Sequence, residues 1–178
     1  MEKHDIYDMY RNKTGKTTER GKPLDAGEYR LAVTACIFNE KGELLIQQRQ
    51  PFKDDWANMW DFTAAGSAIS GETPQTAIER ELFEELGMAV NLQGIRPHLT
   101  VNFNGGFNDF FLLEKEVDLD KLCLQYEEVQ AVRWADREEV LAMIEKGEFI
   151  SYYPGLVDFI FESRKAYGSH KSEDLKKG

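Results

Sequence analysis

The chain has 178 residues, of which 42% are apolar and 12% aromatic, and its 22 basic and 32 acidic side chains give a net charge of −10. Such a chain can bury a sizeable core, which excludes an intrinsically disordered protein and a small disulfide-stapled scaffold. The negative charge argues against tight binding to a nucleic acid or an anionic membrane, because both would repel it. A phosphate that binds here needs a cation beside it.

The two cysteines, Cys36 and Cys123, stand in apolar stretches with no second Cys or His at metal-ligand spacing. This pattern predicts two buried, reduced thiols and a reducing compartment. The sequence begins with polar residues rather than an apolar signal segment, and no apolar run approaches the ~20 residues that span a bilayer. We therefore expect a cytoplasmic protein.

The N-terminal residues 1–28 are polar and rich in turn residues, yet they include several apolar side chains, which favours an arm packed on the domain. Tyr29–Phe38 is nearly continuously apolar and rich in β-favouring residues, so it predicts a buried strand. The turn sequence at 39–42 and the apolar run at 43–49 complete a predicted β-hairpin.

A helix is predicted over Pro74–Leu86 because its two ends are marked. Thr73 stands at the N-cap position, Pro74 at the first helical position and Gly87 just past the end. Four apolar residues are expected to pack this helix on the sheet, namely Ile78, Leu82, Phe83 and Leu86.

The rest of the chain predicts further strands and helices without regular βα alternation. This order favours a mixed sheet flanked by helices, an α/β fold of the α+β type, over a doubly wound parallel sheet. We expect one domain over 29–168 and a flexible tail over 169–178. The predicted strands are Gly94–Phe103, Phe107–Leu113 and Val129–Trp134, and the predicted helices follow Asp136 to Lys146 and cover Leu156–Arg164.

Three glutamates on the first predicted helix, Glu81, Glu84 and Glu85, are spaced i, i+3, i+4 and therefore share one face. Like charges held together on a helix repel, and a cation among them relieves the repulsion. Carboxylate oxygens select a hard ion, Mg²⁺ or Mn²⁺. The simpler alternative is a solvated, Glu-rich helix face.

The residues around these glutamates argue against the simpler alternative. They fill every fixed position of the pattern G-x5-E-x7-R-E-U-x-E-E-x-G-U, in which U is a bulky aliphatic residue. By chance this is expected on the order of one time in a million. The pattern is the signature of the Nudix family, which the chain resembles over about 29–164. The matching residues are Gly66, Glu72, Arg80, Glu81, Leu82, Glu84, Glu85, Gly87 and Met88.

The resemblance implies an α/β/α sandwich and a divalent-metal-dependent hydrolase. Its substrate would be a small diphosphate, such as a nucleoside diphosphate derivative, attacked by water at phosphorus. The resemblance also implies that a homodimer could form through the arm, although no pattern in the sequence demonstrates it. Which diphosphate is cleaved and how many metal ions bind stay open.

The resemblance also implies roles for single residues. Glu81, Glu84 and Glu85 would bind the metal and Gly66 would place a backbone carbonyl near it. Arg80 would orient a motif carboxylate, while Glu72 and Gly87 would be structural. The general base stays open between Glu81, which we favour, and Glu127 or Glu128.

An isomerase is the main rival, because F-N-x-K-G-x-L-L from Phe38, followed by Arg49, Trp56 and Trp60, resembles isopentenyl-diphosphate isomerases of the Nudix superfamily. In that comparison Arg49, at the end of the second strand, is a candidate phosphate contact.

The rival lacks its chemical agents. Ala65 stands at the place of the isomerase's catalytic Cys, and Arg30 and Ser67 stand at the places of metal-binding histidines. We therefore expect a hydrolase in an isomerase-like branch. A catalytically silent nucleotide-binding module is the alternative from another class.

Overall fold

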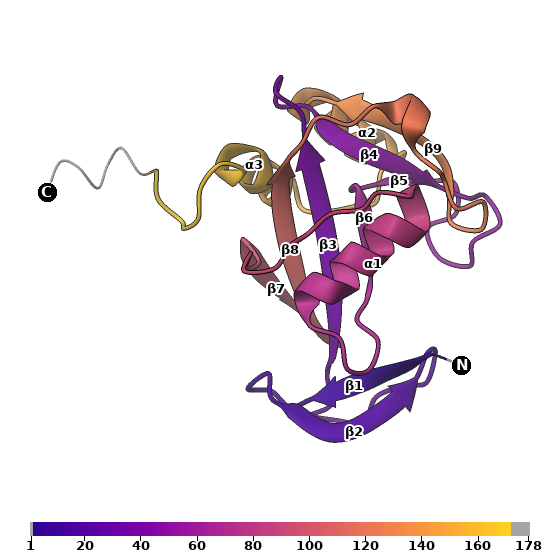
Figure 1. The fold of residues 1–178 in the computed structure, drawn as a ribbon, viewed down its shortest axis with the longest axis vertical. Coiled ribbons are helices and arrows are strands. Elements are labelled where there is room, and N and C mark those ends of the chain that lie inside the picture. The colour runs from indigo at the N-terminus through magenta and orange to yellow at the C-terminus, as the bar shows by residue number, and fades with distance from the viewer. Residues whose placement is uncertain (1, 172–178) are drawn as a thin grey trace, which may run out of the picture. The chain divides into compact units, whose positions relative to one another are not determined.

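The computed structural model describes residues 2–171, and Figure 1 shows the course of the chain through its helices and strands. The chain forms two compact units, each built from two stretches of sequence. The first unit comprises Met1–Ala35 and Ala64–Phe111, and the second comprises Cys36–Thr63 and Leu112–Gly178. Strands β3 (Arg30–Phe38) and β8 (Gly106–Glu114) contribute residues to both units. No helix within residues 2–171 is both long and apolar enough to cross a membrane.

The first unit begins with a two-stranded antiparallel sheet of β1 (Lys3–Tyr7) and β2 (Lys13–Glu19). The sequence did not predict these strands, because β2 is polar and exposed along most of its length and shows no alternation. The turn between them is fixed by Asp8, whose carboxylate accepts from the backbone N–H of Tyr10 at 2.9 Å and of Asn12 at 2.8 Å.

The larger sheet of the first unit is mixed. Strand β6 (Ala64–Ser67) pairs antiparallel with β3, and β7 (Leu99–Phe103) pairs antiparallel with β8. Strands β3 and β8 run in the same direction, because the N–H of Arg30 donates to the carbonyl of Gly105 at one end and Lys115 donates to Phe38 at the other. The predicted mixed sheet is confirmed.

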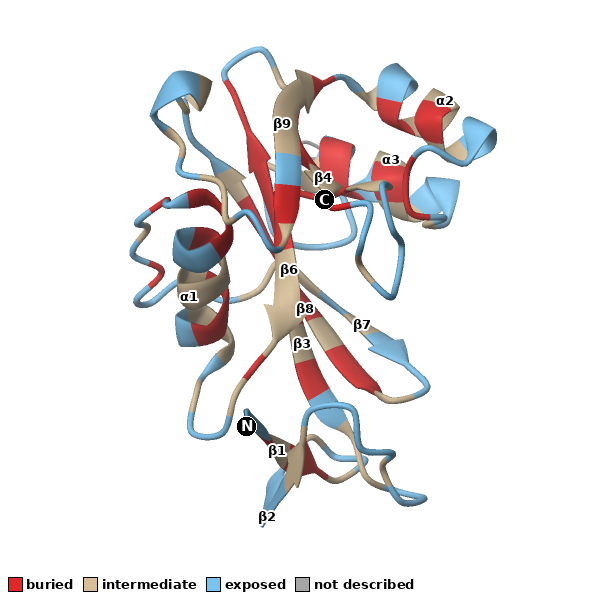
Figure 2. Cartoon of the chain, turned by 90° about the vertical axis from the view of Figure 1, so that its right-hand side faces the viewer, coloured by how far each residue is buried: buried red, intermediate tan, exposed pale blue. Residues whose placement is uncertain are grey.

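Helix α1 (Pro74–Leu86) has the predicted bounds. The Thr73 hydroxyl accepts from the N–H of Thr76 at 3.2 Å, and Gly87 ends the helix with a left-handed φ of 67°. The buried stripe of α1 packs on β6 and includes Glu85 in place of the predicted Phe83, which is 62% exposed (Figure 2). Ile78, Leu82, Glu85 and Leu86 follow i, i+4, i+7, i+8, whereas Phe83 lies outside that stripe.

The second unit confirms the predicted β-hairpin, since Phe38 of β3 pairs with Leu44 of β4. Strand β4 also pairs antiparallel with β5 and β9, and the core is aromatic: Phe62 stacks on Tyr152 with a centroid distance of 4.4 Å. The elements are β4 (Leu44–Arg49), β5 (Trp60–Asp61), a 3₁₀ turn (Leu119–Lys121), β9 (Val129–Ala135), α2 (Arg137–Lys146) and α3 (Pro154–Ser163).

Two further predictions are wrong, and a third concerns residues that the structure mostly does not describe. The strand expected from Gly94 begins at Leu99, because Gly94 takes a left-handed turn with φ 79°. Cys36 is buried as predicted, but Cys123 is exposed, because it lies in an irregular segment whose neighbours Leu122 and Leu124 are themselves only half-buried. Most of the expected tail, 172–178, lies outside the described residues.

Candidate functional site

The first feature of the site is a close fit between Gly66 on β6 and Glu81 on α1. The Glu81 carboxylate lies directly over the Gly66 backbone, where a Cβ would overlap it. Gly66 is therefore the residue that makes room for a half-buried carboxylate between helix and strand. The structure thus supplies a steric reason for a glycine at this position. The sequence had suggested a role only for the backbone carbonyl of Gly66.

Arg80 links the acidic residues of the motif. Its guanidinium binds Glu72 with two bonds, Nε to Oε1 at 2.8 Å and Nη2 to Oε2 at 3.1 Å. Its Nη1 donates to Glu81 Oε1 at 2.9 Å and to Glu84 Oε2 at 3.0 Å. A further bond joins Nη2 to the carbonyl of Ser67 at 3.1 Å. One planar cation therefore orients three carboxylates, a task for which the rigid fork of Arg is suited.

Glu72 joins the loop before α1 to the helix. Besides its two bonds to Arg80, its Oε2 accepts from the backbone N–H of Ile69 at 2.9 Å. The hydrogen bond to Glu72 is the largest cause of a raised pKa for Arg80. These contacts are those of a residue that positions the loop.

The pKa of Glu81 is raised from 4.5 to about 7, and burial is the largest cause. The charge and hydrogen bond of Arg80 act in the opposite direction, while the negative charges of Glu84 and Glu72 add to the rise. A carboxylate with a pKa near neutrality can accept a proton from water at physiological pH. A cation placed beside such a carboxylate also stabilises its charged form.

The three glutamates lie at different depths: the Glu84 side chain is 49% exposed, Glu81 is half-buried and Glu85 is buried. Within residues 2–171, no three Asp, Glu, His or Cys side chains are gathered so that they could hold a metal ion as they stand. Arg80 Nη1 bonds both Glu81 and Glu84 and supplies a compensating charge there.

The donor set nevertheless fits a hard divalent cation, since it consists of carboxylate oxygens beside a strand carbonyl. A cation would have to share or replace the bonds that Glu81 and Glu84 make with Arg80. Burial, together with the smaller repulsion from Glu84 and Glu72, disfavours the charged form of Glu81 and supplies a reason for a cation to bind.

Three other predicted residues belong to the second unit. The Arg49 guanidinium donates to the carbonyl of Asp55 from Nε at 3.2 Å and from Nη2 at 3.1 Å. Glu128 pairs with Lys53 at 2.6 Å, and Glu127 is exposed. Their roles in phosphate binding and proton transfer stay predictions.

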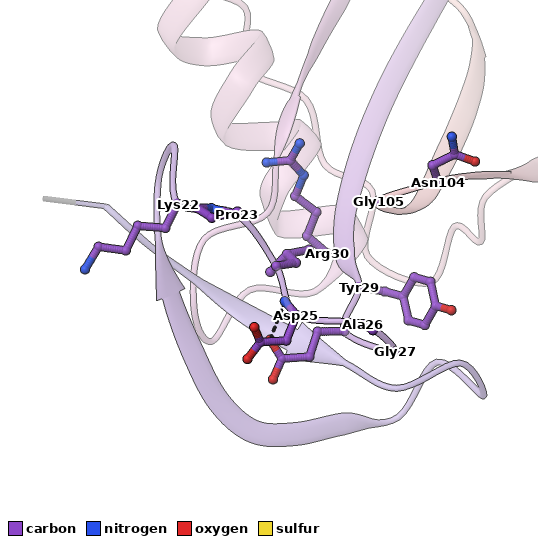
Figure 3. A pocket seen from close by; sticks show the side chains of 11 residues that line it. Lys22, Pro23, Asp25, Ala26, Gly27, Tyr29, Arg30, Asn104 and Gly105 are labelled. Atoms are coloured by element: carbon purple, nitrogen blue, oxygen red, sulfur yellow. Dashed lines mark hydrogen bonds between the residues drawn. The ribbon is translucent and has the colours of Figure 1, made fainter.

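The positions that distinguish an isomerase carry neither a thiol nor an imidazole. Ala65 and Ser67 lie on β6, paired with Thr34 and Ala32 of β3. Arg30 lines an open cavity of about 430 Å³ between the 22–30 connection and the turn at 104–105 (Figure 3). No motif carboxylate lines this cavity, so its size does not mark the reacting centre.

Sequence reasoning missed the part of the arm that touches the site. Asp5 and Lys13, on β1 and β2, contact the loop that carries Glu72. The sequence had indicated that residues 1–28 pack on the domain as an arm, but it had not indicated these contacts.

Known proteins resemble this chain over most of its length. A family profile described as NUDIX domain matches residues 28–153. An uncharacterized Nudix hydrolase of Listeria monocytogenes is 48% identical over 153 residues, which cover 86% of this chain and 90% of that protein. The isopentenyl-diphosphate Delta-isomerase of Corynebacterium diphtheriae is 26% identical over 136 residues, or 71% and 74% of the two chains.

Among solved structures, a Deinococcus radiodurans protein superposes with a TM-score of 0.71 at 24% identity, covering 90% of this chain and 98% of that chain. This likeness confirms the predicted α/β class with a mixed sheet. The isomerase match likewise confirms the resemblance to that branch.

Proposed function

The chain belongs to the Nudix family and is a hydrolase, and from this premise we propose that it hydrolyses the phosphoanhydride bond of a small diphosphate, a nucleoside diphosphate derivative being the favoured class. Water attacks phosphorus and a phosphate group leaves. The proposal rests on one observation: the Glu81 carboxylate fits closely over Gly66. Arg80 holds this carboxylate in place and also binds Glu72 and Glu84.

We propose that Mg²⁺, or Mn²⁺, is the cofactor. Glu81, Glu84 and Glu85 would hold it, with the Gly66 carbonyl as a further oxygen ligand. When bound, such an ion neutralises charge that develops on the phosphate oxygens and lowers the pKa of a coordinated water. It also gives a chain of net charge −10 the local positive charge that an anionic substrate requires.

The protein's own residues have separate tasks in this proposal. Glu81 is the favoured proton acceptor, because its half-buried carboxylate is held in a fixed position over Gly66 by the bond from Arg80 Nη1. Arg80 orients Glu81 and Glu84 through Nη1, and Glu72 fixes the guanidinium from the other side. Positioning of this kind lowers the barrier by removing motions that the reaction would otherwise have to freeze.

A panel of diphosphates tests the reaction. Nucleoside di- and triphosphates, nucleotide sugars and prenyl diphosphates are incubated with Mg²⁺ or Mn²⁺ in ¹⁸O-labelled water, and all phosphorylated products (nucleotide, sugar phosphate, phosphate or pyrophosphate) are separated and quantified. We expect turnover of at least one class, with ¹⁸O in one of the two phosphorylated products because water attacks phosphorus. No turnover of any member with either metal would refute the proposal, and isomerisation of isopentenyl diphosphate without phosphate release would favour the rival.

The metal ligands are tested separately with Glu84→Gln and Glu85→Gln. Each variant should lose most of the activity while it keeps the melting temperature of the wild type, because only one charge changes. Wild-type turnover in both variants would show that the metal assignment is wrong. A silent binding module predicts metal-independent nucleotide binding without turnover, so the same assays distinguish it.

A further inference from the structure

The N-terminal hairpin β1–β2 makes direct contact with the loop that precedes α1. The backbone N–H of Ser70 donates to the carbonyl of Lys3 at 2.7 Å, as if β1 were extended by one more partner. The buried His4 ring places Nδ1 3.0 Å from the carbonyl of Ala68, at the end of β6. The hairpin therefore follows the chain from the end of β6 into the loop.

Asp5 is the principal side chain in this contact. Its carboxylate accepts from the Ser70 hydroxyl at 2.6 Å and from the N–H of Gly71 at 3.0 Å, and it pairs with Lys13 Nζ at 2.7 Å. Burial by itself raises the pKa of Asp5, but the bonds from Gly71, Lys13 and Ser70 outweigh burial and lower the pKa to about 2. The carboxylate is therefore ionised at every pH at which the enzyme is expected to work.

Lys13 extends the contact to the motif itself. Its Nζ, already paired with Asp5, donates to the backbone carbonyl of Glu72 at 3.1 Å. Glu72 is the carboxylate that binds both Nε and Nη2 of Arg80. Hydrogen bonds and ion pairs thus connect Asp5 through Lys13 and Glu72 to Arg80, and Arg80 in turn binds Glu81 and Glu84.

Apart from the hairpin, the loop is held mainly by Glu72, which accepts from the Ile69 N–H and binds Arg80. Ser70, Gly71 and Thr73 are exposed, and Gly71 has a left-handed φ of 93° with nothing near its Cβ position. A loop without packed side chains depends on hydrogen bonds for its conformation. The hairpin that supplies those bonds is itself fixed at its turn, where Arg11 pairs with the fully buried Asp109.

We infer that Asp5 and Lys13 are positioning residues of the hydrolase: they fix the loop so that Glu72 can hold Arg80 against Glu81 and Glu84. This inference rests on the proposed roles of the motif residues. Neither side chain touches the reacting atoms, so their effect is on geometry. Groups that orient metal ligands through an intermediate residue typically change affinity or activity by about 10- to 100-fold.

The test compares Asp5→Asn and Lys13→Met with Glu19→Gln. Glu19 lies in the same hairpin and pairs with exposed Lys22 at 2.7 Å, so its variant removes one charge and one ion pair without touching the loop. Lys13 is 46% exposed, so Lys13→Met tests the inference even if Asp5→Asn folds poorly. Lys13→Arg keeps the cation and serves as the conservative variant.

Three quantities are measured: kcat and KM for a diphosphate that the wild type cleaves, Mn²⁺ affinity by electron paramagnetic resonance, and hydrogen exchange of the amides at 69–72. For Asp5→Asn and Lys13→Met we expect kcat and Mn²⁺ affinity to fall about tenfold, KM to stay near the wild-type value, and the loop amides to exchange faster. Glu19→Gln and Lys13→Arg should match the wild type in all three.

Two outcomes would overturn the inference. In one, the loop amides exchange faster in Asp5→Asn while kcat and Mn²⁺ affinity stay at wild-type values, so that the loop does not position the site. In the other, Glu19→Gln lowers kcat as much as Asp5→Asn does, so that the hairpin acts on stability alone. A wild type that neither binds Mn²⁺ nor cleaves any diphosphate would instead refute the proposed function.

Discussion

Burial raises the pKa of Glu81 in the first unit to about 7 and the pKa of Asp61 in the second unit to about 6. Their immediate partners differ. Asp61 Oδ1 accepts from two neutral donors, the N–H of Phe62 at 2.7 Å and the hydroxyl of Tyr152 at 2.9 Å. Glu81 is held by the Arg80 cation, which it shares with two further carboxylates.

This difference shows which of the two shifts points to chemistry. Neutral donors fixed by a strand and an aromatic core hold Asp61 in place, and the charge of Arg49 is the smallest of the causes that act on its pKa. The carboxylates around Arg80 keep like charges close together, an arrangement that a divalent cation relieves. We therefore expect the raised pKa to mark a functional group at Glu81 and to follow from packing at Asp61, and the predictions below test that distinction.

The largest effect is expected from Glu81→Gln. Gln keeps the shape and the hydrogen bond to Arg80 but can neither accept a proton nor bind a metal with a full charge. We expect kcat to fall about a thousandfold, within the range for loss of a general base. Steady-state kinetics with Mg²⁺ measure it, and a fall of less than about threefold would assign the base elsewhere, with Glu127 or Glu128 as the next candidates.

The same variant should be more stable than the wild type in metal-free buffer above pH 7. Because the folded pKa of Glu81, about 7, exceeds its ordinary value of 4.5, the folded state binds more protons between these values, and stability falls as pH rises through that window. Gln carries no such penalty. The rise in the pKa of Glu81 corresponds to about 3 kcal/mol in the free energy of unfolding. Urea unfolding with EDTA at pH 4.5 and pH 8 should show the gain at pH 8 alone.

A smaller loss is expected from Gly66→Ala. The added methyl group would occupy the place of the Glu81 carboxylate, so the carboxylate must move. A displacement of about 1 Å at a reacting group costs up to about a hundredfold in rate. Gly155→Ala is the matched control, since its Cβ would meet nothing within 4 Å and its φ is ordinary. Equal kcat values for the two variants would remove the steric argument for Gly66.

The parts of the fold that sequence reasoning predicted are those with local signals. Thr73, Pro74 and Gly87 mark both ends of α1, and the structure places the helix between the same residues. The Nudix pattern identified the glutamates because the pattern is dense over 23 positions, from Gly66 to Met88. Patterns of this kind depend on residue type and spacing alone, so one sequence is sufficient to show them.

The parts it did not predict depend on contacts between distant residues. Strand β2 is polar and exposed, so it shows neither alternation nor an apolar run, and its place is decided by Lys13 bound to Asp5 and Glu72. The exposure of Phe83 had no local signal either. Which side chains of α1 are buried depends on how the helix packs on β6, and this packing buries Glu85 and leaves Phe83 exposed.

The smallest effect on activity is expected from Asp61→Asn. Asn retains the oxygen that accepts from Phe62 and Tyr152, so the geometry should persist. We expect kcat with Mg²⁺ to stay within about twofold, or about 0.4 kcal/mol, of the wild type. The loss of stability that the wild type shows between about pH 4 and pH 6 should diminish, since the folded pKa of Asp61 lies above its ordinary 3.8. A tenfold fall in kcat would show that Asp61 also contributes to activity, and a raised pKa alone would then identify site residues without regard to the charge of their partners.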